Sequence, residues 1–341
     1  MYICAESMRN LQSISGRGII VLMEGSGCMP GARGRIAVIG GANMDIGGFP
    51  GNALVMGDSN PGRVRMSPGG VGRNIADNAA RLGLDVQLFS ALGDDANGRA
   101  LLDDCRDKGI QTDGCRIVSG GHTSIYLFID DGRGEMLCAV SDMDIQRALT
   151  PEYLEPRLEE LNAMDAVALD ANLPEETIRF LAESLEVPVF ADAVSTAKVG
   201  KLRGALGRLH CLKPNRIEAE LLTGMEIRSV EDAVRAAERL NAAGVRCVYL
   251  TLGLQGAVCA GEGACAFLPC DARGAVSATG AGDAFAAALL WAHCEGLDLL
   301  ESCTAGMAAA AIAVGAAEAV SPELNRKNLI ERMAMIRRKR I

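Results

Sequence analysis

From residue 35 onward, short apolar runs alternate with amphipathic segments of helical length, and this alternation constrains the fold more than any other feature. The first run, Arg35 to Gly40, reads Arg-Ile-Ala-Val-Ile-Gly and has the pattern of a buried strand. Alternating strands and helices are typical of βαβ units, whose parallel strands are covered on both faces. Further strands are expected at 86–91, 166–169, 189–191, 209–212 and 247–251, and helices at 73–82, 97–108, 175–185 and 230–243 and from near 281 and 301. The sequence therefore predicts a doubly wound, mostly parallel α/β sheet with helices on both faces.

Two segments, 46–66 and 120–142, interrupt the alternation. The first is rich in Gly, Asn and Pro, and the second places two apolar runs on either side of Asp130-Asp131-Gly132-Arg133-Gly134, which is a hairpin signal. We expect the two segments to form a small β-lid over the carboxyl ends of the strands, where α/β proteins bind ligands.

The N-terminal segment, the net charge and the cysteines narrow the class of protein to which this chain can belong. Residues 1–34 show no sustained period and are expected to be a poorly ordered extension, which leaves 35–341 as one domain. The net charge of −9 has the wrong sign for a nucleic-acid partner. The longest apolar run near the N-terminus, 18–23, is too short to cross a membrane. Twelve cysteines without a C-x-x-C pair indicate reduced thiols, and we expect a cytoplasmic protein.

The strongest chemical motif is Thr279-Gly280-Ala281-Gly282-Asp283, which leads into an Ala-rich helix. The N–H groups at a helix start and the positive end of its dipole can stabilise a phosphoryl group that gains charge during transfer. Asp283 at the rim could accept a proton from an attacking hydroxyl. The competing interpretation is a glycine turn with Asp283 as a helix cap.

Two further motifs lie in segments that should meet the first. Ser67-Pro68-Gly69-Gly70-Val71-Gly72-Arg73-Asn74 is a second glycine-rich turn into a helix, where a sugar could lie against backbone and meet the Asn74 carboxamide. Asn43 and Asp45 follow the first strand and suit bonds to vicinal hydroxyls. The competing interpretation is a simple turn for each motif, and a glycine cluster alone usually serves only a turn.

Two clusters follow later strands. Asn215 and Glu218 are one helical turn apart and could together hold a hydrated Mg²⁺, although a helix cap is the competing interpretation. Thr251 and Gly253 could accommodate the phosphate and ribose of a nucleotide. The sequence has no Gly-x-x-x-x-Gly-Lys-Ser/Thr motif, which excludes a P-loop enzyme, and no G-x-G-x-x-G after the first strand, which argues against a dinucleotide dehydrogenase.

The motifs at 69–83, 215–218 and 279–285 resemble, in order and spacing, the first signature, the N-x-x-E motif and the second signature of the PfkB, or ribokinase-like, family. The resemblance covers about residues 36–335 and implies a ribokinase-like fold with a β-lid, ATP as phosphoryl donor, Mg²⁺ and a small-molecule acceptor. It implies that Asp283 is the catalytic base and that Gly280, Ala281 and Gly282 form the anion hole. It further implies three sets of binding residues: Asn43, Asp45, Gly69, Gly70 and Asn74 for substrate; Asn215, Thr251 and Gly253 for nucleotide; and Glu218 with Asn215 for metal.

Within the family, segments 58–62, 70–76, 141–145 and 192–198 are similar to pseudouridine kinases. This similarity implies phosphorylation of pseudouridine at its 5′-hydroxyl. A ribokinase, a purine nucleoside kinase and a non-catalytic nucleoside-binding protein are the alternatives, and the intact Asp283 weighs against the last.

Three expectations concern details of the site and assembly. Many relatives have Asp where this chain has Ser277, which puts activation by a monovalent cation in doubt. Lys198 and Lys201 are expected to be exposed helix lysines rather than phosphate ligands. A partner's strands sometimes complete the lid in this family, and the apolar residues Tyr126 and Phe128 are compatible with a homodimer through the lid.

Overall fold

The computed structural model describes residues 34–132, 136–270, 280–316 and 318–338. Its centre is an eight-stranded sheet in the order β14-β13-β12-β11-β10-β9-β1-β4. The strands of this sheet are β1 (Arg35–Ile39), β4 (Asp85–Phe89), β9 (Ala166–Asp170), β10 (Val189–Asp192), β11 (Cys211–Lys213), β12 (Cys247–Thr251), β13 (Gly256–Gly261) and β14 (Ala264–Pro269). The neighbours from β4 to β12 pair in parallel, so the predicted mostly parallel sheet is confirmed.

One edge of the sheet is antiparallel, which the sequence analysis did not anticipate. Strand β13 pairs antiparallel with both β12 and β14. The connection from β12 to β13 is the short turn 252–255, which is too short for the crossover that a parallel pair needs. The expected strand at 86–91 is also divided: β4 ends at Phe89, and β5 (Ala91–Gly93) pairs with β6 (Arg116–Val118) in a separate two-stranded sheet.

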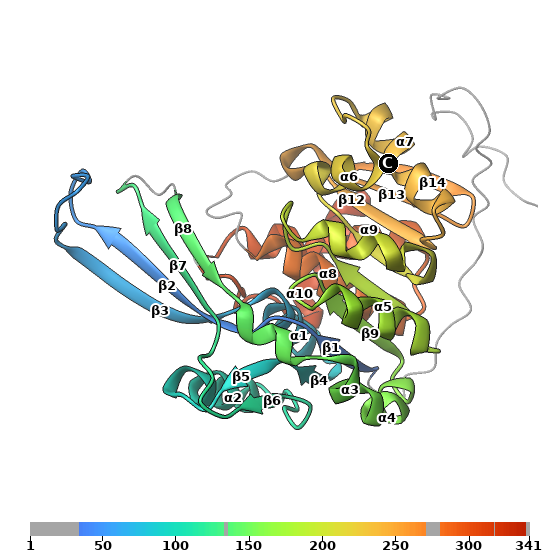
Figure 1. The fold of residues 1–341 in the computed structure, drawn as a ribbon. Helices are drawn as coiled ribbons and strands as arrows, with labels where there is room; N and C mark the ends of the chain where they lie inside the picture. The colour runs from blue at the N-terminus through green and yellow to red at the C-terminus, as the bar shows by residue number, and fades with distance from the viewer. Residues whose placement is uncertain (1–33, 133–135, 271–279, 317, 339–341) are drawn as a thin grey trace, which may run out of the picture.

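Helices cover both faces of the main sheet, as predicted. One face packs against α1 (Val71–Arg81), α8 (Ala281–Cys294), α9 (Leu299–Ala313) and α10 (Arg326–Arg338). The other packs against α5 (Glu175–Ser184), α6 (Arg216–Thr223), α7 (Val230–Ala242) and the short helices α3 (Pro151–Leu154) and α4 (Leu158–Asn162). Helix α2 (Ala96–Asp107) lies beside β5 at the end of the molecule below the lid (Figure 1). Side chains alternate between the two faces of the sheet along β1. Ile36 and Val38 therefore point into the core on the side of α1 and α8, and Ala37 and Ile39 into the core on the side of α5 and α7.

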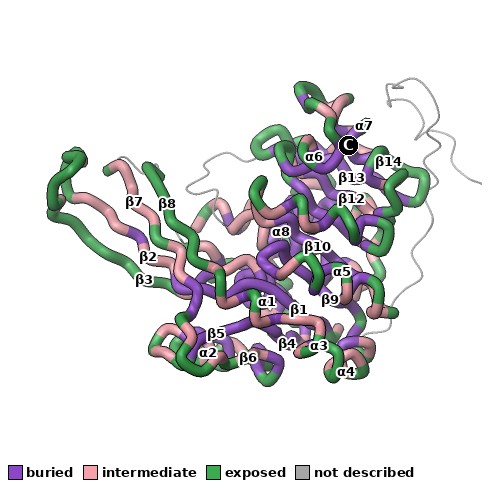
Figure 2. Tube along the Cα trace, viewed as in Figure 1, coloured by how far each residue is buried: buried purple, intermediate pink, exposed green. Residues whose placement is uncertain are grey.

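A second sheet projects from the body of the molecule (Figure 1). It contains β2 (Asn43–Pro50), β3 (Gly62–Gly69), β7 (Ile125–Asp130) and β8 (Met136–Asp142), in the order β3-β2-β7-β8. Strands β7 and β8 form the antiparallel hairpin that the sequence predicted, although residues 133–135 at its turn lie outside the described residues. We call these four strands the lid sheet. Figure 2 shows that most of it is exposed or half-buried, whereas the strands of the main sheet are buried.

Candidate active site

Charged side chains gather where three adjacent strands of the main sheet end. Asp170 ends β9, Asp192 ends β10 and Lys213 ends β11, and all three side chains are buried. Lys213 Nζ lies 3.0 Å from Asp192 Oδ2. Burial alone would lower the pKa of Lys213, but the charges of Asp192 and Glu218 offset this effect and raise the pKa. Lys213 is therefore a fixed cation at the carboxyl edge of the sheet.

Asp283 lies in the first turn of α8, next to this cluster. Asn74 of α1 donates a hydrogen bond from Nδ2 to Asp283 Oδ2 at 2.9 Å. Burial, followed by the negative charge of Asp192, raises the pKa of Asp283 to about 7, although the Asn74 bond and Lys213 act in the opposite direction. A carboxylate with a pKa near neutrality is well suited to accept a proton from a hydroxyl group. The environment thus fits the predicted base, an assignment that stays a prediction.

The start of α8 has the close-packed backbone that an anion hole requires. Gly280 precedes the helix with φ 78°, a conformation that favours glycine, and a Cβ built there would lie 1.8 Å from the Ala319 carbonyl oxygen. A Cβ on Gly282 would lie 3.3 Å from Lys213 Nζ, so the lysine ammonium is beside the helix N-terminus. Residues 280–282 therefore combine N–H groups that have no partner within the helix with a neighbouring cation. Thr279 and Ser277 lie outside the described residues.

The residues predicted to bind the sugar meet at the base of the lid sheet. Asn43 Nδ2 donates to Asp45 Oδ1 at 2.6 Å, and a Cβ on Gly69 would lie 2.2 Å from Asp45 Oδ2. Gly70 has φ 96°, and a Cβ there would lie 2.4 Å from the Gly41 carbonyl oxygen. Asn74, which is 5% exposed, follows in α1 and extends the group to Asp283. The fold thus brings all five predicted sugar-binding residues and the predicted base into one contiguous region.

Asn215 and Glu218 make the capping box that was the competing interpretation of their motif. Asn215 Oδ1 accepts from Glu218 N–H at 3.0 Å, and Glu218 Oε2 accepts from Asn215 N–H at 2.8 Å. Asn215 is two residues beyond Lys213 and pairs as an isolated bridge with Thr251. Gly253 is exposed, with φ 59° and open space where a side chain would be. The residues predicted to bind the nucleotide therefore lie close in the chain or by strand pairing to Lys213 at the end of β11, and the space around Gly253 is open.

A carboxylate and a carboxamide oxygen at one helix start are suitable donors for Mg²⁺, which keeps several of its water ligands. Burial raises the pKa of Glu218, although the Asn215 N–H and Lys213 act against this effect. Within the described residues no group of three or more His, Cys, Asp or Glu side chains could hold a metal ion. The donor set thus fits a cation bound largely through water and nucleotide oxygens rather than a cage of protein ligands.

The expectation for Lys198 and Lys201 is wrong. Both are partly buried, and Lys198 Nζ donates to Asn172 Oδ1 at 2.5 Å, while Lys201 Nζ donates to the carbonyls of Ala171 and Leu173 at 3.1 and 2.8 Å. Burial lowers the pKa of both lysines. Their partners precede them by more than 25 residues, so local helical patterning could not reveal these contacts.

Asp170 and Asn172 lie in the candidate site, and the sequence analysis missed both. Asp170 Oδ2 accepts from the Gly41 N–H at 2.8 Å, and a Cβ on Gly41 would lie 2.7 Å from Asn172 Nδ2. Asp170 thereby fixes the turn that carries Asn43 and Asp45. The signal was present in Asp170-Ala171-Asn172, a polar group directly after a buried strand, at the same sheet edge as the motif after β1.

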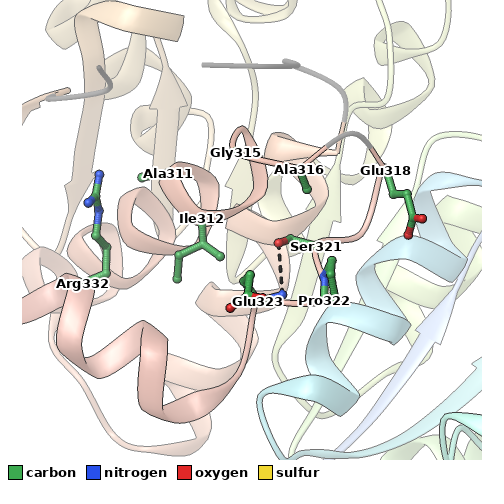
Figure 3. Close-up of a pocket in the computed structure, with 9 residues that line it drawn as sticks. All are labelled: Ala311, Ile312, Gly315, Ala316, Glu318, Ser321, Pro322, Glu323 and Arg332. Atoms are coloured by element: carbon green, nitrogen blue, oxygen red, sulfur yellow. Dashed lines mark hydrogen bonds between the residues drawn. The ribbon is translucent and has the colours of Figure 1, made fainter. Parts of the chain in front are cut away.

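A cavity of about 490 Å³ lies beside this region, between the end of α9, the loop that follows it and α10 (Figure 3). Its lining includes Ile312, Ser321 and Arg332 but none of the predicted site residues. The residues of the candidate site at the carboxyl edge of the sheet thus lie outside the lining of this cavity. The same loop contributes the Ala319 carbonyl that packs against Gly280.

Comparisons with known proteins show which proteins this chain resembles. Residues 33–326 match the pfkB family carbohydrate kinases. The chain is 36% identical over 297 residues to the pseudouridine kinase of Escherichia coli, covering 86% of this chain and 95% of that protein. It is 35% identical over 327 residues to the uncharacterized sugar kinase YeiI of Escherichia coli, covering 95% and 87%. The crystal structure of ribokinase from Thermotoga maritima superimposes with a TM-score of 0.79 at 26% identity, covering 88% of this chain and 99% of that one.

Proposed function

This chain belongs to the pfkB family of carbohydrate kinases, and we propose that it transfers the γ-phosphate of ATP to the 5′-hydroxyl of pseudouridine. Family membership makes the chain a phosphotransferase with an alcohol acceptor, acting on a sugar or nucleoside. The observation that carries the assignment of the reacting centre is the position of Asp283. This carboxylate lies at the N-terminus of α8, bonded to Asn74 from the sugar-binding group and close to the Lys213 cation.

In the proposed reaction, the hydroxyl oxygen attacks the γ-phosphorus while the bond from phosphorus to the oxygen bridging the β- and γ-phosphates breaks, which releases ADP. The hydroxyl proton passes to Asp283, whose pKa of about 7 makes it an effective acceptor at neutral pH. The N–H groups at the start of α8 face the charge that accumulates on the transferred group, and Lys213 adds a fixed positive charge.

Asn215 and Glu218 are the residues we propose to hold Mg²⁺, and Thr251 and Gly253 are the proposed nucleotide contacts. When bound, the cation would neutralise charge on the ATP phosphates. Because the capping box occupies atoms of both side chains, their contribution through bound water is more consistent with the structure than direct coordination. We expect only a weak response to K⁺, since Ser277 replaces the Asp of many relatives.

Support for pseudouridine as the substrate comes from the identity of 36% with a pseudouridine kinase over most of both chains. YeiI, a sugar kinase, is similar to nearly the same degree, so another sugar or nucleoside, such as ribose or a purine nucleoside, is the competing proposal. Pseudouridine differs from uridine by its C-glycosidic bond and one additional ring N–H. A buried acceptor for that N–H would be left without a partner by uridine, at a cost of about 1–3 kcal/mol.

Steady-state kinetics with Mg·ATP on pseudouridine, uridine, ribose and adenosine test this proposal. We expect kcat/KM for pseudouridine to exceed that for uridine by about 10-fold or more, and that for ribose by a larger factor because ribose lacks the base. Equal efficiency on uridine, or a preference for ribose or adenosine, would exclude the pseudouridine assignment and leave the kinase assignment in place.

We also propose that residues 35–341 form the kinase domain, that the lid segments 46–66 and 120–142 close over the substrate, and that a second copy of the chain binds to the lid sheet. Strands β3 and β8 expose apolar side chains: Val64 is 72% exposed, Met66 57% and Val140 66%. Exposed apolar side chains grouped on one sheet are typical of a contact surface.

No helix among the described residues is long and apolar enough to cross a membrane.

A further inference from the structure

Arg73 is a buried cation between the sugar-binding group and the predicted base. It lies in α1 and is 2% exposed. Its Nη1 donates to the Pro68 carbonyl and to Asn74 Oδ1, both at 2.9 Å, and its Nη2 donates to Asp77 Oδ2 at 2.5 Å. The guanidinium thus joins the end of β3, the Asn74 carboxamide and a carboxylate that is itself fully buried.

The chemistry of Arg73 determines which end of the Asn74 amide faces Asp283. A guanidinium can only donate hydrogen bonds, so the side of the carboxamide that faces it must be the oxygen. The NH₂ end then points away from Arg73, toward Asp283 Oδ2 at 2.9 Å. We propose that Arg73 is a positioning residue that locks the Asn74 amide in the orientation that donates to the catalytic base.

A second layer of charges surrounds Asp77 and Arg73. Asp77 Oδ2 also lies 2.9 Å from Lys108 Nζ, and Asp77 Oδ1 lies 2.8 Å from Arg81 Nε. Asp104 of α2 approaches Arg73 Nη2 at 3.4 Å. Lysine has one charged nitrogen in place of a planar fork and could not bond Asp77, Asn74 and the Pro68 carbonyl in the same geometry. The site therefore specifically requires arginine.

Release of the amide would change the protonation of the base. If the Asn74 oxygen turned toward Asp283, it would repel the ionised carboxylate in place of stabilising it, so the pKa of Asp283 would rise further. The other charges that act on Asp283 are Asp170, Asp192 and Lys213 from β9, β10 and β11, and these do not depend on Arg73 for their contacts. Because the base works ionised, the acid limb of the kcat/KM profile would move to higher pH.

The test compares Arg73→Lys with Arg81→Lys. Both changes keep a cation beside Asp77, but Arg81 is 30% exposed in its side chain and pairs with the other oxygen of that carboxylate. We expect Arg73→Lys to lower kcat about 10-fold and to shift the acid limb upward by about half a pH unit or more, and Arg81→Lys to change neither by more than about 2-fold. The proposal would be overturned if Arg73→Lys kept the wild-type kcat and the wild-type position of the acid limb. It would also be overturned if both variants lost kcat to the same extent.

Two further variants distinguish loss of the Asn74 orientation from a general loss of fold in Arg73→Lys. Asn74→Asp retains an acceptor for Arg73 but removes the donor to Asp283, and we expect the acid limb to rise in this variant too. In an Asn74→Ala background, Arg73→Lys should cause no additional loss of kcat, since the group it positions is gone; a further 10-fold loss would overturn the proposal.

The inference rests on the proposed role of Asp283, and the design separates the two. All measurements use whichever substrate the parent enzyme phosphorylates, so failure of the pseudouridine assignment leaves the comparison intact. If Asp283→Asn retains activity, the base assignment fails and the positioning role fails with it. If Asp283→Asn is inactive and Arg73→Lys is normal, only the positioning role fails.

Discussion

The carboxyl edge of the main sheet and the lid sheet differ in what surrounds their strands. Strands β9 and β10 are buried along their whole length, and the charged residues at their ends are held by neighbouring backbone and side chains. Every described residue of β8 is exposed, and only the end of β3 that joins α1 is shielded. Packing therefore fixes the atoms of the proposed reacting centre, whereas the outer strands β3 and β8 of the lid sheet are available to substrate, solvent or another chain.

The largest expected effect concerns the buried edge. Asp283→Asn keeps the size of the side chain but removes its ability to accept a proton. We expect kcat to fall by a factor on the order of 10² or more while nucleoside binding, measured by calorimetry, stays nearly unchanged. Turnover within a few-fold of the parent would remove Asp283 from the role of base.

The pH dependence of kcat/KM examines the same residue without mutation. The pKa of Asp283 is raised to about 7, so the carboxyl group is ionised, and active as a base, only above this pH. We expect kcat/KM to fall about 10-fold for each pH unit below the limb, which should lie near pH 7 in place of the ordinary carboxyl range near pH 4. A rate that stays constant down to pH 5 would contradict this prediction.

Asp45→Ala tests the junction between the two regions, because Asp45 lies in β2 where the lid sheet meets the body. Loss of charge-assisted bonds to the sugar hydroxyls, each worth about 1.5–3 kcal/mol, should weaken substrate binding by about 10-fold or more. ATP affinity should change little. Asp103→Ala, which removes a carboxylate that is 72% exposed on α2, is the matched control. Unchanged calorimetric affinity in Asp45→Ala would contradict the assignment.

The smallest effect on the fold itself is expected at the lid. Val64→Asp places a charge on an exposed side chain of β3, and its effect on the free energy of unfolding should stay within about 0.5 kcal/mol. If a second copy binds there, sedimentation velocity should show a dimer for the parent and for the control Ile330→Asp, which changes an exposed side chain of α10, but a monomer for Val64→Asp. A monomeric parent protein at micromolar concentration would end the dimer proposal.

Local sequence patterns were sufficient for the parallel sheet and for the ordered motifs. The alternation in Ile36 to Ile39 gave both buried faces of β1, and the glycines at 69–70 and 280–282 identified turns that other parts of the chain approach closely. The lid hairpin followed from its turn residues in the same way.

What the sequence did not reveal depends on contacts between distant segments. The ion pair of Lys213 with Asp192 joins two strand ends, and the burial of Lys198 depends on Asn172. Arg73 is adjacent to Asn74 in the chain, yet its network includes Asp104 of α2 and Lys108, which directly follows that helix. The antiparallel edge at β13 arises from hydrogen bonds with β12 and β14 that no periodicity of Gly256–Gly261 specifies.

The contact between Gly280 and Ala319 limits how this enzyme can be altered. Any side chain at 280 would meet a backbone carbonyl at 1.8 Å rather than a flexible side chain, and the backbone there would also be strained at φ 78°. A library that seeks new acceptor specificity should therefore keep position 280 invariant and draw its diversity from the exposed positions of β3 and β8. Directed evolution would in this way vary exposed side chains and leave the proposed phosphoryl-transfer centre unchanged.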